Sequence, residues 1–381
     1  MLAVSYIITI LFFITYAGLI IYYRQSWLSI PEFQPSLINY LPSTKISIII
    51  PARNEEKNIG ICLHSILSQN YPAHLFEIII VDDHSTDKTA DVIKSFDTKT
   101  IKLISLKDFT EGSQLNSYKK KAIEIAIQQS TGDLIITTDA DCIVKNTWLQ
   151  TIAGFYEQYK PAFIAGPVAY SNENNFLTIF ESLDFMTMQG ITGAAVYKKF
   201  HTMCNGANLA YEKKVFHEVE GFKGIDNIAS GDDMLLMHKI YERHSERVLY
   251  LKSKDAIVET RPAGSFAAFF NQRIRWASKA DKYDDKRVFL VLLLVYFFNL
   301  WFIALFTIGF WNIKFEILLI ELLIAKTIIE LFFLFPVSDF FSKQKLLWWF
   351  SIAQPFHIVY VVIAGWLGKF GTYKWKERKV R

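Results

Sequence analysis

Acidic residues occur in pairs along the middle of this sequence, and each pair adjoins a hydrophobic or helical pattern. The pairs are Asp82 with Asp83, Asp139 with Asp141, and Asp232 with Asp233. Carboxylates can accept hydrogen bonds from a nucleoside, bind a divalent cation together with phosphate oxygens, or take a proton from a hydroxyl group. The pairs therefore predict a site that binds a phosphorylated nucleoside and transfers a proton beside it.

Asp82 and Asp83 end the hydrophobic run 77–81 and stand just before a predicted helix at 87–95. Ser85 could cap that helix, which is the structural explanation for polar residues at this point. Capping does not account for two carboxylates at the end of a strand. We therefore predict that Asp82 and Asp83 accept hydrogen bonds from a base N–H and a ribose hydroxyl.

Asp139 and Asp141 follow the run Leu134-Ile135-Ile136. Alternate residues at the end of a strand can point to the same side. Mg²⁺ and Mn²⁺ take oxygen ligands and are commonly shared between such carboxylates and substrate phosphates. The D-x-D pattern thus predicts a divalent cation that neutralises a diphosphate leaving group, and a surface turn is the alternative.

Ser230-Gly231-Asp232-Asp233 precedes a helical pattern at 234–241. Asp is favourable at a helix N-terminus because of the helix dipole, and this explanation needs no function. The functional interpretation is that one carboxylate removes the proton from an acceptor hydroxyl as that oxygen attacks a sugar.

Two further segments are candidates for contacts with the acceptor or the diphosphate. Within the stretch 265–280, Arg273 and Arg275 suit phosphate oxygens and Trp276 suits stacking on a sugar ring. The same stretch also has the composition of an amphipathic helix at a membrane surface. Asn205-Gly206-Ala207-Asn208 is a polar turn in apolar surroundings, which turn chemistry alone would explain.

The elements that must position these residues alternate between strand and helix patterns. Strands are expected at 46–50, 77–81, 101–106 and 134–138, and helices at 58–69, 87–95 and 117–129. Such alternation predicts an α/β fold whose mostly parallel sheet has helices on both faces. Ligands of these sheets bind at the carboxyl ends of the strands, where the polar residues fall, including Pro51, Asn54 and Glu55 after the first strand.

Apolar segments at both ends predict transmembrane helices. Leu2 to Tyr23 carries no charge, and a cleaved signal peptide is disfavoured because no basic stretch precedes it and no small-residue cleavage site follows. Three more runs, 288–311, 317–336 and 346–367, follow near the other end. The middle run contains Lys326 and Glu330, which are spaced to form an i, i+4 pair, so two or three of these runs cross.

Charge and cysteine content restrict the class and the compartment. The net charge of +4 reflects a basic tail at 368–381, which suits a cytoplasmic flank near anionic lipid, and no base-reading pattern accompanies it. We therefore expect membrane lipids and no nucleic acid as partners. Cys62, Cys142 and Cys204 form neither a disulfide framework nor a CxxC metal pattern, which fits a reducing cytosol. Arg24 places the following residues on the cytoplasmic side.

Taken in order, five motifs resemble the signature set of membrane-associated family 2 glycosyltransferases, which include cellulose, chitin and hyaluronan synthases and ceramide glucosyltransferases. The motifs are Pro51-Ala52-Arg53-Asn54-Glu55, Val81-Asp82-Asp83, Asp139-Ala140-Asp141, Gly231-Asp232-Asp233 and Gln272-Arg273-Ile274-Arg275-Trp276. The resemblance implies a GT-A fold and an inverting, metal-assisted transfer from a nucleotide-diphosphate sugar, with a UDP-sugar expected. The acceptor would be a hydroxyl of a lipid-linked or glycan molecule at the cytoplasmic face of the plasma membrane.

The resemblance also assigns roles and boundaries. Donor nucleotide binding falls to Pro51, Asn54, Glu55, Asp82, Asp83, Lys119 and Asp139, metal binding to Asp139 and Asp141, and the catalytic base to Asp233 or Asp232. Acceptor or diphosphate binding falls to Asn205, Gly206, Asn208, Gln272, Arg273, Arg275 and Trp276. The expected parts are a transmembrane helix at 1–24, the GT-A domain at 45–264, an interfacial helix at 265–287, a transmembrane region at 288–367 and the tail.

Two departures and two alternatives stay open. Tyr118 stands where the family has Gly beside Lys119, and the base motif reads Gly-Asp-Asp where these enzymes often have Glu-Asp. The chain could be a processive polysaccharide synthase of the same family, although the few spans favour a single transfer. A membrane binding or scaffold protein without activity is the alternative of another class.

Overall fold

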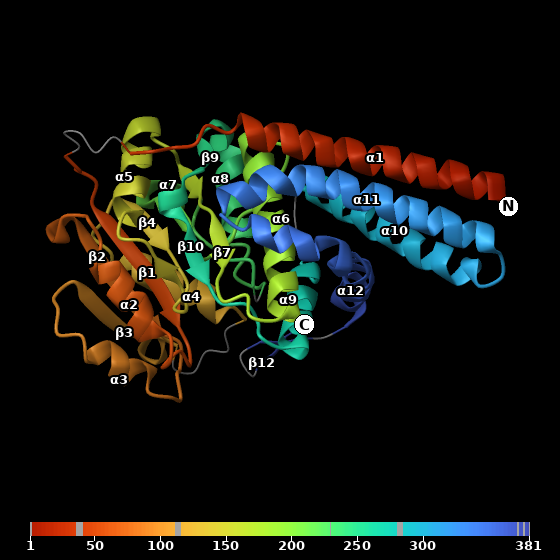
Figure 1. The fold of residues 1–381 in the computed structure, drawn as a ribbon. Helices are drawn as coiled ribbons and strands as arrows, with labels where there is room; N and C mark the ends of the chain where they lie inside the picture. Colours follow the sequence, from red (N-terminus) through yellow and green to blue (C-terminus); the bar gives the residue numbers. More distant parts are fainter. Residues whose placement is uncertain are drawn as a thin grey trace. The chain divides into compact units, whose positions relative to one another are not determined.

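The computed structural model describes residues 2–35, 41–110, 116–228, 230–279 and 285–371, and the backbone of 373–375 and 378–380. Lys376 and Arg381 of the predicted basic tail lie outside the described residues. The chain divides into two compact units, an α/β unit of residues 31–169 and 202–261 and a helical unit of residues 1–30, 170–201 and 262–381. The two units are described one at a time (Figure 1).

The described part of the α/β unit contains a seven-stranded sheet in the order β3-β2-β1-β4-β8-β6-β9. Its strands are β1 (Ile46–Ala52), β2 (Phe76–Asp82), β3 (Ile101–Ser105), β4 (Leu134–Thr137), β6 (Phe163–Ala165), β8 (Leu209–Glu212) and β9 (Val248–Tyr250). β1 to β4 are mutually parallel, whereas β8 runs antiparallel to both of its neighbours. The prediction of a mostly parallel α/β sheet is therefore confirmed.

The central residues of β1 and β2 are fully buried because their apolar side chains point to both faces of the sheet. Ile48, Ile49 and Ile50 of β1 have no exposed surface, and neither do residues 78–81 of β2. Pro51 lies opposite Val81 in the parallel register, so β1 and β2 end at the same edge.

Short helices complete this unit. They are α2 (Ile59–Leu67), α3 (Thr89–Lys94), α4 (Tyr118–Gln128), α5 (Trp148–Tyr159), α7 (Lys213–Glu218) and α8 (Met234–His244), with single 3₁₀ turns at Ala73–Leu75, Leu106–Phe109, Ser245–Arg247 and Lys254–Ala256. A three-stranded sheet joins β5 (Ile143–Val144), β10 (Val258–Thr260) and β7 (Val168–Tyr170). α4 packs on β1 and β2, which brings its first turn to the edge where those strands end.

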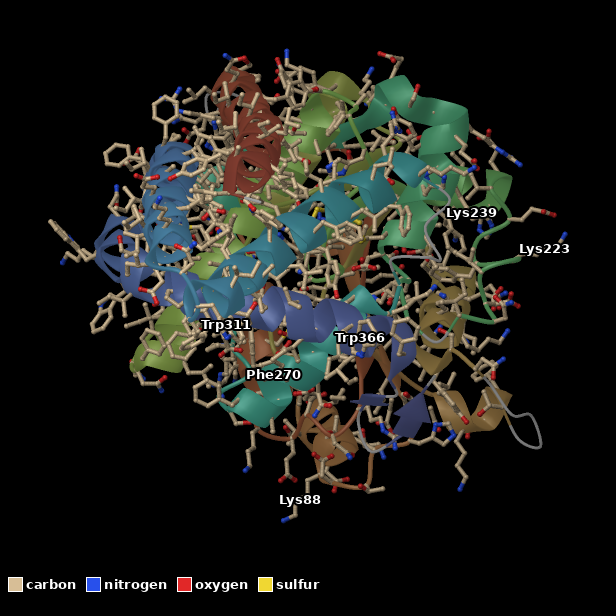
Figure 2. All side chains as sticks on the ribbon, turned by 90° about the vertical axis from the view of Figure 1, so that its right-hand side faces the viewer. Lys88, Lys223, Lys239, Phe270, Trp311 and Trp366 are labelled. Carbon is tan, nitrogen blue, oxygen red and sulfur yellow. The ribbon has the colours of Figure 1, made fainter. Side chains whose placement is uncertain are left out.

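The helical unit contains α1 (Leu2–Ser29), α6 (Phe176–Tyr197), α9 (Phe266–Ala277), α10 (Lys286–Gly309), α11 (Ile313–Phe340), the 3₁₀ turn Gln344–Trp349 and α12 (Phe350–Phe370). A short antiparallel pair, β11 (Tyr373–Trp375) and β12 (Arg378–Val380), follows. Among the described residues, the segments Leu2–Ser29, Lys286–Gly309 and Gln344–Phe370 are long and apolar enough to cross a membrane. Trp366 of α12 and Trp311, in the turn between α10 and α11, are both exposed (Figure 2).

Two predicted boundaries differ in the structure. The first helix continues past Arg24 to Ser29. The Arg24 guanidinium lies over the Phe332 ring of α11 and donates to the Phe332 carbonyl. The range 45–264 does not form one compact unit, because α6 packs against α1 and α11 and joins the helical unit.

The predicted Lys326–Glu330 pair is present in α11. The Lys326 Nζ lies 2.7 Å from a Glu330 carboxylate oxygen and 2.7 Å from the Gln354 Oε1 of α12. Glu330 also accepts hydrogen bonds from Gln354 and from the Tyr16 hydroxyl of α1. Lys326 has no exposed surface, so the cluster is buried. Its contacts join the three helices α1, α11 and α12.

We expect Lys326→Met to destabilise the protein by about 3–5 kcal/mol, because it leaves the buried Glu330 carboxylate without its cation. The double variant Lys326→Met/Glu330→Leu should recover most of that loss, since no uncompensated charge remains. Thermal unfolding of the detergent-solubilised protein measures both. Equal losses in the single and double variants would contradict the pairing.

Candidate functional site

The loops that follow β1 and β2 hold each other in place by side chain–backbone hydrogen bonds. The Asn54 Oδ1 accepts from the Thr86 amide at 2.8 Å, and the Ser85 Oγ accepts from the Asn54 amide at 3.0 Å. The Glu55 amide donates to the Thr89 Oγ1 at 2.7 Å. Asn54 has a φ of 53°, a left-handed conformation that Asn tolerates better than most residues. Asn54, predicted to bind donor, thus has a structural part in shaping the loop.

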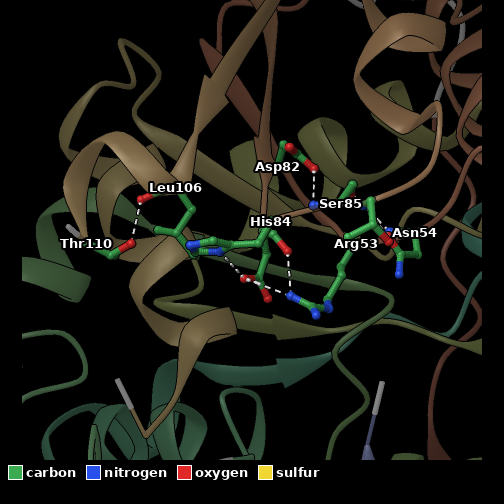
Figure 3. A network of polar contacts seen from close by, with 9 residues as sticks. Arg53, Asn54, Asp82, His84, Ser85, Leu106 and Thr110 are labelled. Atoms are coloured by element: carbon green, nitrogen blue, oxygen red, sulfur yellow. Dashed lines mark hydrogen bonds and ion pairs between the residues drawn. The ribbon is translucent and has the colours of Figure 1, made fainter. Parts of the chain in front are cut away.

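Asp83 is buried at the end of β2. Arg53, Asp82, His84 and Ser85 belong to the polar network around it (Figure 3). The His84 Nδ1 lies 3.0 Å from the Asp83 carboxylate, and the Arg53 Nη1 lies 3.8 Å from the same oxygen and donates to the Asp83 carbonyl at 3.0 Å. The Asp82 carboxylate accepts from the Ser85 amide at 3.2 Å. Sequence reasoning assigned no site role to Arg53 or His84, although Arg53 lies inside the Pro51–Glu55 motif.

Lys119, in the first turn of α4, links two of the acidic pairs. Its Nζ lies 2.9 Å from an Asp139 carboxylate oxygen and 3.1 Å from an Asp232 oxygen. Burial would lower the pKa of Lys119, but the Asp139 and Asp232 carboxylates outweigh it and raise the pKa above its ordinary value. The end of β4 and the segment before α8 therefore meet at one ammonium group.

Asp233 joins the same cluster through backbone amides. One Asp233 oxygen accepts from the Gly206 amide at 3.1 Å, and the other accepts from the Met234 amide at 2.8 Å, so Asp233 also caps α8. A Cβ atom on Gly206 would lie only 3.4 Å from the Lys119 Nζ and 3.6 Å from Asp233. The Asn205–Asn208 turn and the Gly-Asp-Asp segment are therefore in contact.

Asp141 lies close to other carboxylates in a half-buried position. Burial first, and then the negative charges of Asp139 and Glu55, raise the pKa of Asp141 to about 6. The Thr260 hydroxyl of β10 donates to Asp141 at 3.2 Å. Thr260 was not expected, because nothing in the sequence connects it with a residue 119 positions away. In the described ranges, no group of three or more His, Cys, Asp or Glu side chains is arranged to bind a metal.

Asn208, predicted to bind acceptor, lies in a buried, hydrogen-bonded position. Its side chain is 2% exposed and donates to the carbonyls of Pro167 and Ala256, at 2.9 and 2.8 Å. The Asn208 Oδ1 accepts from the Trp148 indole at 3.1 Å. These bonds connect separate segments of the α/β unit, so Asn208 has a structural role. The Asn205 Oδ1 instead accepts locally, from the Ala207 amide at 3.0 Å.

Arg273, predicted to bind acceptor or diphosphate, is likewise buried. It is 4% exposed, lies 2.7 Å from the Asp184 carboxylate of α6, and has the rings of Phe269 and Trp276 within 4.8 and 4.3 Å of its Cζ. Burial would lower the pKa of Arg273, but Asp184 raises it, so the charge stays paired inside the helical unit. The Arg273 side chain therefore fixes α9 on α6.

The other residues of the α9 motif retain exposed surface. Gln272 accepts from the Tyr170 hydroxyl at 3.3 Å and from the Arg273 Nη1 at 2.8 Å. Arg275 and Trp276 are each partly exposed on the same helix. α9 is thus a helix anchored through one arginine, with the second arginine and the tryptophan at its surface.

Comparison with protein families agrees with this fold. The family model for Glycosyl transferase family 2 matches residues 47–220, and the model for Glycosyl transferase family group 2 matches residues 134–367. The second match spans more than half of the chain. The protein belongs to the family 2 glycosyltransferases, and its α/β unit has the GT-A fold.

Two individual relatives share about a quarter of their residues with this chain over the matched part. The chain is 26% identical over 292 residues to Probable glycosyltransferase YdaM of Bacillus subtilis, a match covering 73% of this chain and 66% of the relative. It is 27% identical over 189 residues to Glycosyltransferase AglE of Haloferax volcanii, covering 50% and 59%. The matched part of this chain therefore spans less than two thirds of either relative.

A solved structure supports the fold over nearly the whole chain. The mannosyltransferase PcManGT from Pyrobaculum calidifontis, in complex with GDP-Man and Mn²⁺, aligns with a TM-score of 0.61 at 17% identity, covering 96% of this chain and 99% of that protein. At this identity the likeness concerns the fold.

Replacing Asn208 tests its structural role. We expect Asn208→Ala to lower the free energy of unfolding by about 1–3 kcal/mol, because two carbonyls and the Trp148 indole lose their partner in a buried site. Asn205→Ala, which removes only a local bond, is the matched control and should change stability by less than about 0.5 kcal/mol. Urea unfolding followed by tryptophan fluorescence measures both. A stable Asn208→Ala variant with impaired acceptor use would instead restore the original assignment.

Proposed function

We propose that this protein transfers a sugar from a nucleotide diphosphate, with inversion at the anomeric carbon, to a hydroxyl of a lipid-linked or glycan acceptor at the cytoplasmic membrane face. The observation that carries the proposal is the meeting of Asp139 and Asp232 at the Lys119 ammonium, with Asp233 joined to them through the Gly206 amide. Residues from three distant segments thereby surround one position. The family resemblance supports a UDP-sugar as donor.

The nucleoside end of the donor binds at the loops after β1 and β2. Asp82 and Asp83 present carboxylate oxygens, and Arg53 and His84 hold Asp83 in position. A rigid, oriented carboxylate can accept from a base N–H or a ribose hydroxyl without further ordering, which favours binding. Pro51 at the end of β1 completes this edge.

The diphosphate end lies at Asp139 and Asp141. Two neighbouring carboxylates, one of them half-buried with a raised pKa, suit a divalent cation that also takes phosphate oxygens, so the residues fit Mg²⁺ or Mn²⁺ shared with the donor. When bound, the cation neutralises charge on the leaving diphosphate. Lys119 contributes a second positive charge beside Asp139.

Asp233 is the better candidate for the base. Asp232 is paired with the Lys119 ammonium, whereas the described contacts of the Asp233 oxygens are with the amides of Gly206 and Met234. In the reaction the acceptor hydroxyl gives its proton to Asp233 while its oxygen bonds to the anomeric carbon. The bond from that carbon to the diphosphate oxygen breaks, and the nucleotide diphosphate leaves with the electron pair.

The acceptor is proposed to bind at the membrane. Three segments with the length and composition of membrane spans support this location. On α9, Gln272, Arg275 and Trp276 are the proposed contacts with the acceptor or the leaving diphosphate, while Arg273 anchors the helix. The catalytic unit is proposed to face the cytosol, where nucleotide sugars are available.

We expect Asp233→Asn to reduce release of nucleotide diphosphate by at least about 100-fold, because the amide cannot take the acceptor proton. Binding of the nucleotide should persist, since Asp82 and Asp83 are unchanged. The assay uses purified protein in lipid with a panel of labelled nucleotide sugars and lipid extract as acceptor. Asp226→Asn, an exposed acid nearby, is the matched control.

Three outcomes of that assay would contradict a part of the proposal. Full turnover by Asp233→Asn removes the base assignment. Nucleotide binding without release in the unaltered protein indicates a scaffold. Label entering a high polymer rather than lipid would identify a processive synthase.

Removal of divalent cations should abolish turnover, and Mn²⁺ or Mg²⁺ should restore it. For Asp141→Asn, the cation concentration giving half-maximal rate should rise at least about tenfold, because one carboxylate ligand is lost. Asp97→Asn, which removes an exposed carboxylate from the same unit, should leave that concentration unchanged. Turnover that persists in excess chelator would refute the metal site.

A further inference from the structure

The loop between α7 and α8 is held by lysine side chains that contact its backbone carbonyls. Lys120 follows Lys119 in α4, is 1% exposed, and donates to the carbonyls of Ile225 and Ile228, each at 2.6 Å, and of Ser230 at 3.1 Å. An ammonium group has three N–H donors, which is enough for these three bonds. Lys120 therefore fixes the backbone of a segment more than 100 residues away.

The position of these carbonyls gives the contact its importance. Ser230 directly precedes Gly231, which has a φ of 79°, and the two acids Asp232 and Asp233. The place of the Ser230 carbonyl therefore restricts where the two carboxylates can lie. An error of about 1 Å in a reacting group can cost on the order of 100-fold in rate.

The adjacent lysines Lys119 and Lys120 of α4 contact different parts of the candidate site. Consecutive residues of an α-helix point about 100° apart, so the two ammonium groups reach different targets. Lys119 contacts the side chains of Asp139 and Asp232, and Lys120 contacts the backbone that leads to them.

An apolar side chain would fill this buried position without the free-energy cost of desolvating an ammonium group. Burying an ammonium group is costly unless its hydrogen bonds are all satisfied, and an apolar side chain of the same length would avoid that cost. An apolar side chain could not, however, bind three carbonyls and so could not select one conformation of the loop. The chemistry of Lys120 thus matches a requirement for position rather than for packing.

We propose that Lys120 is a positioning residue that holds residues 222–228 and Ser230, before α8, and thereby places Asp232 and Asp233 for transfer. The proposal rests on the proposed function for its kinetic consequence. Its structural part, the hold on the loop, stands on the hydrogen bonds alone.

Lys120→Met keeps the apolar length of the side chain and removes the ammonium group. We expect kcat for transfer to fall about 10- to 100-fold. The KM for the nucleotide sugar should stay within about threefold, because the donor contacts are intact. Hydrogen exchange of the amides from Phe222 to Ile228 should accelerate, with exchange in β1 and β2 unchanged. Lys120→Gln, which keeps two donors, should lie between Met and Lys.

The chain offers a matched control in Lys239 of α8. Its Nζ donates to the carbonyls of Gly221 and Lys223, at 2.7 and 2.8 Å, at the other end of the same loop (Figure 2). Lys239→Met removes the same group from the same loop, away from the acids. We expect it to change kcat by less than about threefold.

The outcomes separate this proposal from the proposed function. The positioning role is overturned if Lys120→Met leaves both kcat and hydrogen exchange unchanged. It is also overturned if Lys239→Met lowers kcat as much as Lys120→Met does, or if Lys120→Met changes only the KM for the donor. If the unaltered protein transfers no sugar, the proposed function fails, and the exchange measurement still decides whether Lys120 holds the loop. If Lys120→Met does not fold, Lys120→Gln is tested by the same measurements.

Discussion

The site depends on one electrostatic contact, the Lys119 ammonium between the carboxylates of Asp139 and Asp232. Like charges at the end of β4 and before α8 would repel each other in a partly buried place, and the cation between them makes their approach favourable. α4 can supply this charge because it packs on β1 and β2 and begins at the edge where they end. The position of Asp233 against the Gly206 amide follows from the same approach.

Backbone hydrogen bonds provide the rigidity that this contact requires. The loops after β1 and β2 exchange hydrogen bonds through Asn54 and Ser85, and Lys120 binds the loop before α8. Loops otherwise lose much conformational entropy when a ligand orders them. In this protein much of that ordering is complete before a donor binds.

The helical unit uses buried charge for a different purpose. Helices that meet in an apolar medium gain little from hydrophobic burial, so polar contacts and close packing decide how they associate. Lys326 and Glu330 join α11 to α1 and α12, and Arg273 joins α9 to Asp184 of α6. Arg273 lies in a motif that suggests phosphate binding, and its ion pair with Asp184 joins two helices.

The sequence by itself determined the local features. Hydrophobic runs predicted β1, β2, β3 and β4 to within two residues, and with them the acids at the strand ends; the i, i+4 spacing predicted Lys326–Glu330. Only the tertiary structure decided which polar side chains face inward. Asn208 and Lys120 donate to carbonyls 41 and 110 residues away in the sequence, those of Pro167 and Ser230, and Arg273 pairs with Asp184 of another helix. Residue type shows what a side chain can bond, but long-range packing selects its partner.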